Sequence, residues 1–150
     1  MKTIGLLLVL ATTSLATDVN FSGTWVLNAT RSKNLGMMAA MQLTETIKQD
    51  GKTLTVSDAG TMNGQTQTTE THYDLAGKAL SNQDFMGQTN ETVSKWNGGQ
   101  LVTTWTTDGA IAGTKVVRTE TRTLSADGKT MTVESARGST PPIVMVFDRK

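Results

Sequence analysis

The sequence predicts an all-β protein: a single antiparallel up-and-down β-barrel or clam of about 8–10 strands, with one short helix after the first strand. Two observations predict this class. Turn signals recur about every 8 to 14 residues, and the segments between them are rich in Thr, Val, Leu and Trp, which is the spacing of a β-meander. The length of 150 residues also suits a single domain.

The turns are the strongest local signals. Six short segments contain Asn, Asp or Gly, which tolerate the positive φ that tight antiparallel reversals require. These segments are 50–51, 63–64, 76–78, 97–99, 108–109 and 127–128. Between and beyond them, strands are expected at 22–28, 43–49, 53–58, 65–75, 79–86, 88–96, 100–107, 114–124, 129–137 and 143–149.

One segment, 29–42, departs from the strand pattern. It carries good helix formers, among them Met37 and Met41, and Ser32 or Asn34 is available as an N-cap. We therefore expect a short helix between the first and second strands.

The N-terminus has the features of a signal peptide. Lys2 supplies a positive charge, residues 4–11 form an apolar run, and small residues stand before a cleavage point after Ala16. The run is about half of the roughly 20 residues that a membrane-spanning helix needs. We predict a signal peptide at 1–16, one domain at 17–150, no membrane span after cleavage, and a bacterial protein exported to the periplasm or secreted.

Charge and cysteine content exclude several classes of function. Of the 14 Lys and Arg residues, removal of Lys2 leaves 13, against 13 Asp and Glu residues, so the mature chain is close to neutral. Near neutrality argues against capture of nucleic acid. The chain has no cysteine, which excludes disulfides and thiolate sites. We expect a monomer with no cofactor and no metal site.

Two strand segments predict something about the interior. Segment 65–75 is polar on both faces, which indicates either a partly wet lumen or a hairpin that projects beyond the core. On the eighth strand, Arg118, Glu120 and Arg122 share one face with Val116. Either this charged row faces water or the lumen carries an Arg-Glu-Arg ladder.

The opening segment 21–27, with Gly23-Thr24-Trp25, resembles the Gly-x-Trp opening of lipocalins and cytosolic fatty-acid-binding proteins, the calycin type. The resemblance extends as a pattern over most of 17–150. It implies a closed or nearly closed barrel around a ligand cavity, with the insert after the first strand as a lid. It also implies that Trp25 packs at the closed base beneath Arg149, a structural cation–π pair.

The last strand departs from that family's pattern. Many fatty-acid-binding proteins hold a carboxylate with an Arg-x-Tyr pair on the last strand and another Arg two strands earlier. Met145 and Phe147 stand at the last-strand positions here, and Arg118 lies approximately at the other Arg. The resemblance is therefore as compatible with a neutral or weakly polar ligand as with a fatty acid.

The resulting prediction is an exported, non-catalytic protein that binds a small, largely apolar or amphipathic molecule in its barrel. No residue is assigned a catalytic role, and His72 is the only histidine. The candidate ligand-binding residues are Met37, Met41, Leu101, Trp105, Val116, Arg118, Met145 and Phe147. Two alternatives stay open: a structural or protein-interaction module of the cell envelope with a filled barrel, and a barrel enzyme that uses lumenal carboxylates.

Overall fold

A computed structural model describes residues 19–84 and 86–150, and the predicted signal peptide 1–16 lies outside them. The described part contains ten strands and one short 3₁₀ helix, η1 (Gly36–Ala40). The strands are β1 (Gly23–Leu27), β2 (Gln42–Gln49), β3 (Thr53–Met62), β4 (Gln65–Asp74), β5 (Leu80–Gln83), β6 (Thr89–Asn97), β7 (Gln100–Asp108), β8 (Lys115–Leu124), β9 (Thr130–Ala136) and β10 (Ile143–Arg149).

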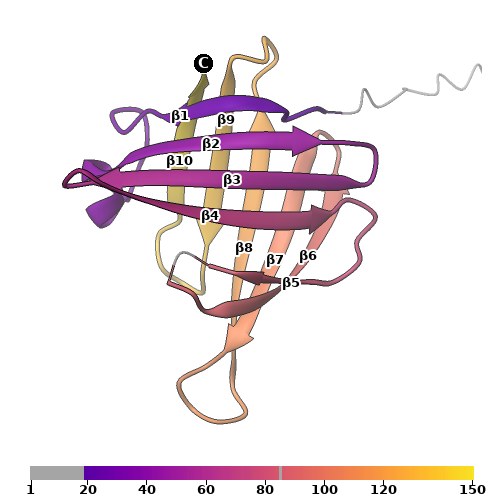
Figure 1. The fold of residues 1–150 in the computed structure, drawn as a ribbon. Coiled ribbons are helices and arrows are strands. Elements are labelled where there is room, and N and C mark those ends of the chain that lie inside the picture. Colours follow the sequence, from indigo (N-terminus) through magenta and orange to yellow (C-terminus); the bar gives the residue numbers. More distant parts are fainter. Residues whose placement is uncertain (1–18, 85) are drawn as a thin grey trace, which may run out of the picture.

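The strands form a nearly closed up-and-down barrel. All the pairings are antiparallel, β10 returns to pair with β1, and the order in the sheet is β4-β3-β2-β1-β10-β9-β8-β7-β6-β5. In Figure 1, β1 to β4 lie across β6 to β10, so the two halves of the barrel face each other over a shared interior. The fold class predicted from turn spacing is confirmed.

The barrel is interrupted between β4 and β5, the two ends of the hydrogen-bonded order. Asn82 of β5 spans this gap with its side chain. Its Oδ1 accepts a bond from the His72 backbone N–H at 2.9 Å, and its Nδ2 donates to the His72 carbonyl at 2.8 Å. The Nδ2 also donates to Thr92 Oγ1 at 2.7 Å. One amide side chain thus satisfies backbone groups that a continuous ladder would pair.

The expected helix is only the single 3₁₀ turn η1, and neither proposed N-cap caps it. Ser32 Oγ instead donates to the Asn28 carbonyl and accepts from the Val146 N–H. Asn34 takes a positive φ of 58° and donates to the Pro142 carbonyl at 2.8 Å. Both side chains therefore fasten the segment to the barrel, which leaves too few free residues for a longer helix.

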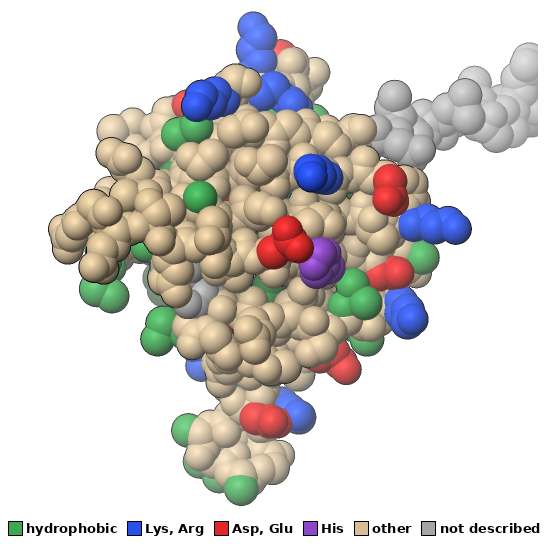
Figure 2. Space-filling model, viewed as in Figure 1, with side chains coloured by type: hydrophobic (Ala, Val, Ile, Leu, Met, Phe, Trp, Pro, Cys, Tyr) green, Lys and Arg blue, Asp and Glu red, His purple; other side chains and the backbone are tan. Residues whose placement is uncertain are grey.

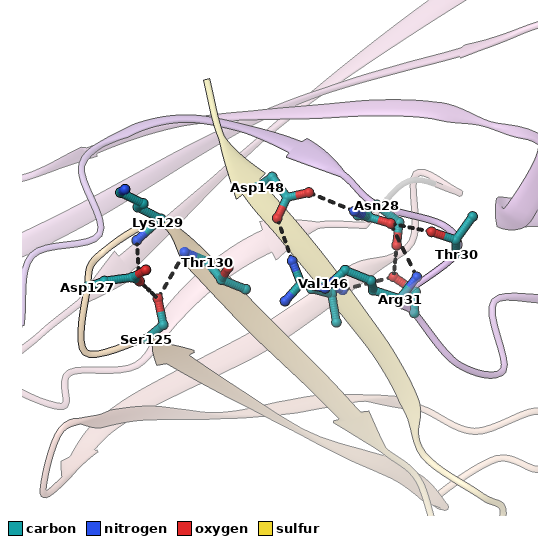
Figure 3. Close-up of polar contacts among 10 residues, drawn as sticks. Asn28, Thr30, Arg31, Ser125, Asp127, Lys129, Thr130, Val146 and Asp148 are labelled. Atoms are coloured by element: carbon teal, nitrogen blue, oxygen red, sulfur yellow. Dashed lines mark hydrogen bonds and ion pairs between the residues drawn. The ribbon is translucent and has the colours of Figure 1, made fainter.

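The segment before η1 is fixed to the last strand. Asn28 Nδ2 donates to Asp148 at 2.7 Å, and Arg31 forms an ion pair with the same carboxylate at 2.8 Å (Figure 3). Further along, Lys33 pairs with Val144 in an isolated bridge. The start of the segment between β1 and β2 is thereby held on β10. Figure 3 also shows the β8–β9 turn, where Asp127 accepts bonds from Ser125 Oγ and the Lys129 N–H.

The base of the barrel is closed by an apolar core around Trp25, which is fully buried. The Arg149 guanidinium lies 4.1 Å from the centroid of the Trp25 ring, so the predicted contact is present. Gly23 has a φ of 142°, and a Cβ there would lie 2.5 Å from Arg149 Nη1. Glycine in the Gly-x-Trp opening therefore makes room for the cation over the ring.

The outer surface drawn in Figure 2 carries scattered charges and no extended patch of one sign. His72 lies on the outside of the barrel beside Glu70, with 3.2 Å between Nε2 and Oε1 and both side chains more than half exposed. Within residues 19–84 and 86–150, no helix has the length and apolar character needed to cross a bilayer.

Candidate functional site

Above the apolar base, the barrel encloses a cavity of about 510 Å³. Inward-facing side chains from both halves of the barrel line it, because alternate residues of each strand point to the interior. The principal lining residues are Met37, Met38, Met41, Leu43, Glu45, Asp58, Met62, Thr69, Thr71, Tyr73, Met86, Asn90, Trp105, Val116, Arg118, Glu120, Arg122, Val133 and Met145.

Methionine dominates the mouth of the cavity. Six of the eight methionines in the chain line it. Met37 of η1 and Met86 after β5 are largely exposed, at 87% and 88%. Met41 reaches inward over Gly60, where an added Cβ would lie 2.7 Å from its sulfur. Flexible thioether side chains adapt to ligands of irregular shape, so this mouth is apolar and deformable.

A buried ion cluster forms the floor. Arg122 of β8 donates to Glu45 of β2 at 2.6 Å and to Glu120 at 3.4 Å, and all three side chains are less than a tenth exposed. The Tyr73 hydroxyl of β4 also donates to Glu120, at 3.4 Å. The guanidinium therefore has carboxylate partners within the protein, as a buried charge requires.

The floor shifts the protonation equilibria of its members. Burial raises the pKa of the Glu45 carboxyl, against the attraction of Arg122, and the nearby Glu120 adds to the rise. Burial lowers the pKa of Arg122, but the two carboxylates outweigh this and raise it overall. Burial and Glu120 together raise the pKa of Tyr73, so its hydroxyl keeps its proton.

Asp58 of β3 stands beside this cluster without joining it. It lies directly across from Glu45 in the β2–β3 ladder and is half-buried in the cavity wall. Within the described part of the chain, its carboxyl forms no hydrogen bond and no ion pair. Burial and the neighbouring Glu45 raise the pKa of Asp58 to about 8. Asp58 thus presents to the cavity a carboxyl group that has no protein partner among the described residues.

Arg118 lies higher on the same face of β8. Its guanidinium is 4.4 Å from the Trp105 ring centroid, and it contacts Ser135 Oγ at 3.3 Å and Glu120 at 3.6 Å. Trp105 also meets Tyr73 edge to face, with 6.1 Å between ring centroids. The Trp105 Nε1 is buried without a hydrogen-bond partner among the described residues.

Six of the eight predicted ligand-binding residues line the cavity: Met37, Met41, Trp105, Val116, Arg118 and Met145. Their part in binding a ligand stays a prediction. The structure places Leu101 and Phe147 elsewhere, in the apolar core of the base. They face inward as expected, but they lie nearer the closed end of their strands. Of the two interpretations of the β8 row, the lumenal Arg-Glu-Arg ladder is the one observed.

Asp58 and Tyr73 were not among the residues predicted for the site, and Glu45 entered the prediction only as one of the strand carboxylates that a barrel enzyme could use. A local signal exists for the two acids. Glu45 shares its strand face with Leu43 and Ile47, and Asp58 shares its face with Val56, so each interrupts an apolar row. A charge in such a row is buried and needs a partner, but the sequence does not say which one.

The described residues contain no group of three or more His, Asp or Glu side chains arranged to hold a metal ion. His72, the only histidine of the chain, points away from the lumen and contacts Thr55 and Glu70 on the outside. The polar chemistry of the interior is therefore that of carboxylates, guanidinium groups and hydroxyls.

No family model and no curated protein matches the chain. Solved structures do match, with TM-scores of 0.64–0.69 and identities of 12–20%. The "REP1-NXSQ fatty acid transporter" is 17% identical, with a TM-score of 0.68, over 86% of this chain and 95% of that one. Lipid binding protein 8 of Caenorhabditis elegans is 14% identical, with 0.69, over 87% and 95%.

Human cRBP IV is 16% identical, with a TM-score of 0.66, over 87% of this chain and 98% of that one. At these identities the likeness shows the fold. The chain shares the fold of a nearly closed, ten-stranded antiparallel barrel with these proteins. The resemblance stated from the Gly-x-Trp opening is confirmed at that level.

Proposed function

We propose that the protein is exported and, without catalysing a reaction, binds one small, largely apolar or amphipathic molecule inside its barrel. The cavity carries this proposal. Its volume of about 510 Å³ lies within the roughly 300–1,000 Å³ of typical small-molecule sites. Its methionine-rich mouth lies above a small set of polar groups, and such a combination of apolar wall and few polar contacts suits an oriented small ligand.

The matching structures support the same class of function. Two of them are described as a fatty acid transporter and a lipid binding protein, and both share the barrel over almost their whole length. A barrel of this shape also hosts unrelated functions, so the cavity itself is the stronger support. An envelope module with a wholly filled lumen fits less well, because the lumen is hollow above the Glu45 and Arg122 layer.

Glu45 and Asp58 are carboxyl groups with a raised pKa inside a cavity, which is an argument for a second candidate, an enzyme that uses lumenal carboxyl groups as acid and base. Arg122 engages both Glu45 and Glu120. This leaves Asp58 as the carboxyl free to exchange a proton with a ligand. Acid–base mechanisms that use two carboxylates need both of them to reach the substrate. The binding role is therefore preferred.

The first test is native mass spectrometry. The full chain is expressed in an exporting bacterium and purified without detergent, and any bound molecule is extracted into solvent and identified. We expect a mass that begins at Thr17 and a small apolar molecule at one copy per chain. A retained leader would contradict export, and a folded protein that neither carries nor takes up an apolar molecule would contradict binding.

A matched pair of variants locates the bound molecule. Val116 lines the cavity, whereas the adjacent Val117 is 49% exposed and faces outward. Val116→Trp should reduce the bound fraction severalfold by filling the mouth, and Val117→Trp should leave it unchanged. Equal effects of the two substitutions would place the molecule outside the barrel.

A further inference from the structure

We propose that the floor of the cavity favours an amphipathic ligand with a positively charged amine head and disfavours one with a carboxylate head. This inference rests on the proposed function, because it names the ligand class of the same cavity. Three features of the interior carry it: the paired state of Arg122, the position of Asp58, and the balance of charges around both.

Arg122 is poorly available to bind the carboxylate of a ligand, because its guanidinium already bonds to two glutamates of the protein. Its Nη1 donates to Glu45 at 2.6 Å and its Nη2 to Glu120 at 3.4 Å. A carboxylate ligand would have to displace one of these partners and leave it buried without a cation. It would also approach the carboxylates of Glu45 and Glu120, and like charges in a low-dielectric interior repel strongly. Above pH 8 the ionised Asp58 carboxylate adds to this repulsion.

The position of Asp58 suits a ligand head. Inward-facing residues of β3 run from Val56 in the closed core, through Asp58 in the cavity wall, to Met62 at the mouth. A head that contacts the Asp58 carboxyl therefore leaves its tail along the methionines, among them Met41 and Met145. This orientation buries the apolar tail and satisfies the one acid of the floor that has no partner among the described residues.

The charged side chains that line the cavity balance one another, except for Asp58. Arg118, Glu120, Arg122 and Glu45 form a chain of alternating sign, with two cations and two anions. At the rim, Asp84 and Arg137 oppose each other in sign. The ammonium head of a ligand would supply the positively charged partner that the Asp58 carboxylate lacks among these groups.

Titratable groups face Asp58 from two sides of the barrel: Glu45 of β2, and Tyr73, Glu120 and Arg122 of β4 and β8. Burial, together with Glu45 and Glu120 and against the attraction of Arg122, holds the pKa of Asp58 near 8, so Asp58 keeps its proton near neutral pH. An ammonium head favours the ionised carboxyl and expels the proton to solvent. Amine affinity should therefore rise as the pH increases through 8.

The test compares three ligands with the same ten-carbon tail by isothermal titration calorimetry: decylamine, decanol and decanoate. The protein is the secreted, ligand-stripped chain, measured between pH 6 and pH 9, where the amine keeps its charge. We expect decylamine to bind at least about tenfold more tightly than decanoate at pH 9. Asp58 with a pKa near 8 is only about 1% ionised at pH 6 and about 90% ionised at pH 9. The affinity for decylamine should therefore rise by up to about ninetyfold over this range, because at the higher pH the carboxyl need not lose a proton on binding.

Asp58→Asn removes the charge and keeps the shape, so it should abolish the amine preference and flatten the pH dependence. Glu134→Gln, at an exposed position on the outside of β9, is the matched control and should change neither. Equal or tighter binding of decanoate by the unaltered protein would overturn the inference, as would an amine preference that survives in Asp58→Asn. If decanol and both charged ligands fail to bind, the proposed function itself fails.

Discussion

The two ends of the barrel interior differ although the same strands build both. On β3, the inward row runs from buried Leu54 and Val56 at the base to Asp58 and Met62 around the cavity. On β10 the row runs from buried Phe147 to half-buried Met145. Alternation is continuous, but the residue type changes along each strand. The closed end is tightly packed and stabilises the fold. The open end is less tightly packed and contains the cavity and the buried charges.

The largest expected effect is at the closed end. Trp25→Ala should lower the free energy of unfolding by about 3–5 kcal/mol, because it opens a cavity in the base and removes the ring under Arg149. Urea unfolding followed by circular dichroism measures this. Val26→Ala, the exposed neighbour on β1, is the control and should cost less than about 1 kcal/mol. Similar losses for both would contradict the structural role of Trp25.

The second effect concerns the buried ions between the two ends. Glu45→Gln should cost about 2–3 kcal/mol, because Arg122 loses its closest anion while an amide oxygen remains to accept a hydrogen bond. Glu70→Gln, on the outer face, should cost less than about 1 kcal/mol. The same unfolding assay compares them. If Glu45→Gln left the free energy of unfolding unchanged, the ion pair between Glu45 and Arg122 would not stabilise the fold.

Asp58 should make stability depend on pH. Its folded pKa of about 8 is above the ordinary value of 3.8, so the folded state holds the proton more tightly. This contribution is complete below about pH 4 and is lost as the pH rises through 8. At pH 9, Asp58→Asn should therefore be more stable than the parent by about 1–2 kcal/mol, since partial exposure to the cavity weakens the effect.

Urea midpoints at pH 5, 7 and 9 measure the Asp58 effect. The raised pKa of Glu45 acts in the same direction, so part of the slope should persist in the variant. Identical pH profiles for the parent and Asp58→Asn would contradict the perturbed carboxyl.

The smallest expected effect is at the gap between β4 and β5. Asn82→Ala removes both bonds to the His72 backbone and one to Thr92 Oγ1, and it should cost about 1 kcal/mol, because the net contribution of protein hydrogen bonds to stability is modest. Amide hydrogen exchange of His72 should become faster. Gln83→Ala, an exposed neighbour on β5, should leave that amide unchanged. Unaltered exchange in Asn82→Ala would show that the gap is closed by other contacts.

Much of the fold could be predicted from local pattern. Strand segments and turns follow from period-two alternation and from Asn, Asp and Gly at the reversals, and these are properties of a few consecutive residues. β3 nevertheless extends to Met62, beyond the expected end at 58, because Gly60 and Met62 continue to pair with β4. The helix expected from composition gave way to one 3₁₀ turn, because Ser32 bonds to Val146 of β10 and Asn34 to Pro142 just before β10 instead.

The sequence by itself determined the all-β class, the turn positions and the face that each strand residue shares, because alternation and backbone preference are local. Only the tertiary structure decided that the β8 row is lumenal, that Arg122 pairs with Glu45, and that Asp58 has no partner among the described residues. Glu45 and Arg122 lie 77 residues apart in the chain. They meet only because the barrel brings β2 and β8 across one interior, and a buried charge depends on such distant neighbours for its partner and its pKa.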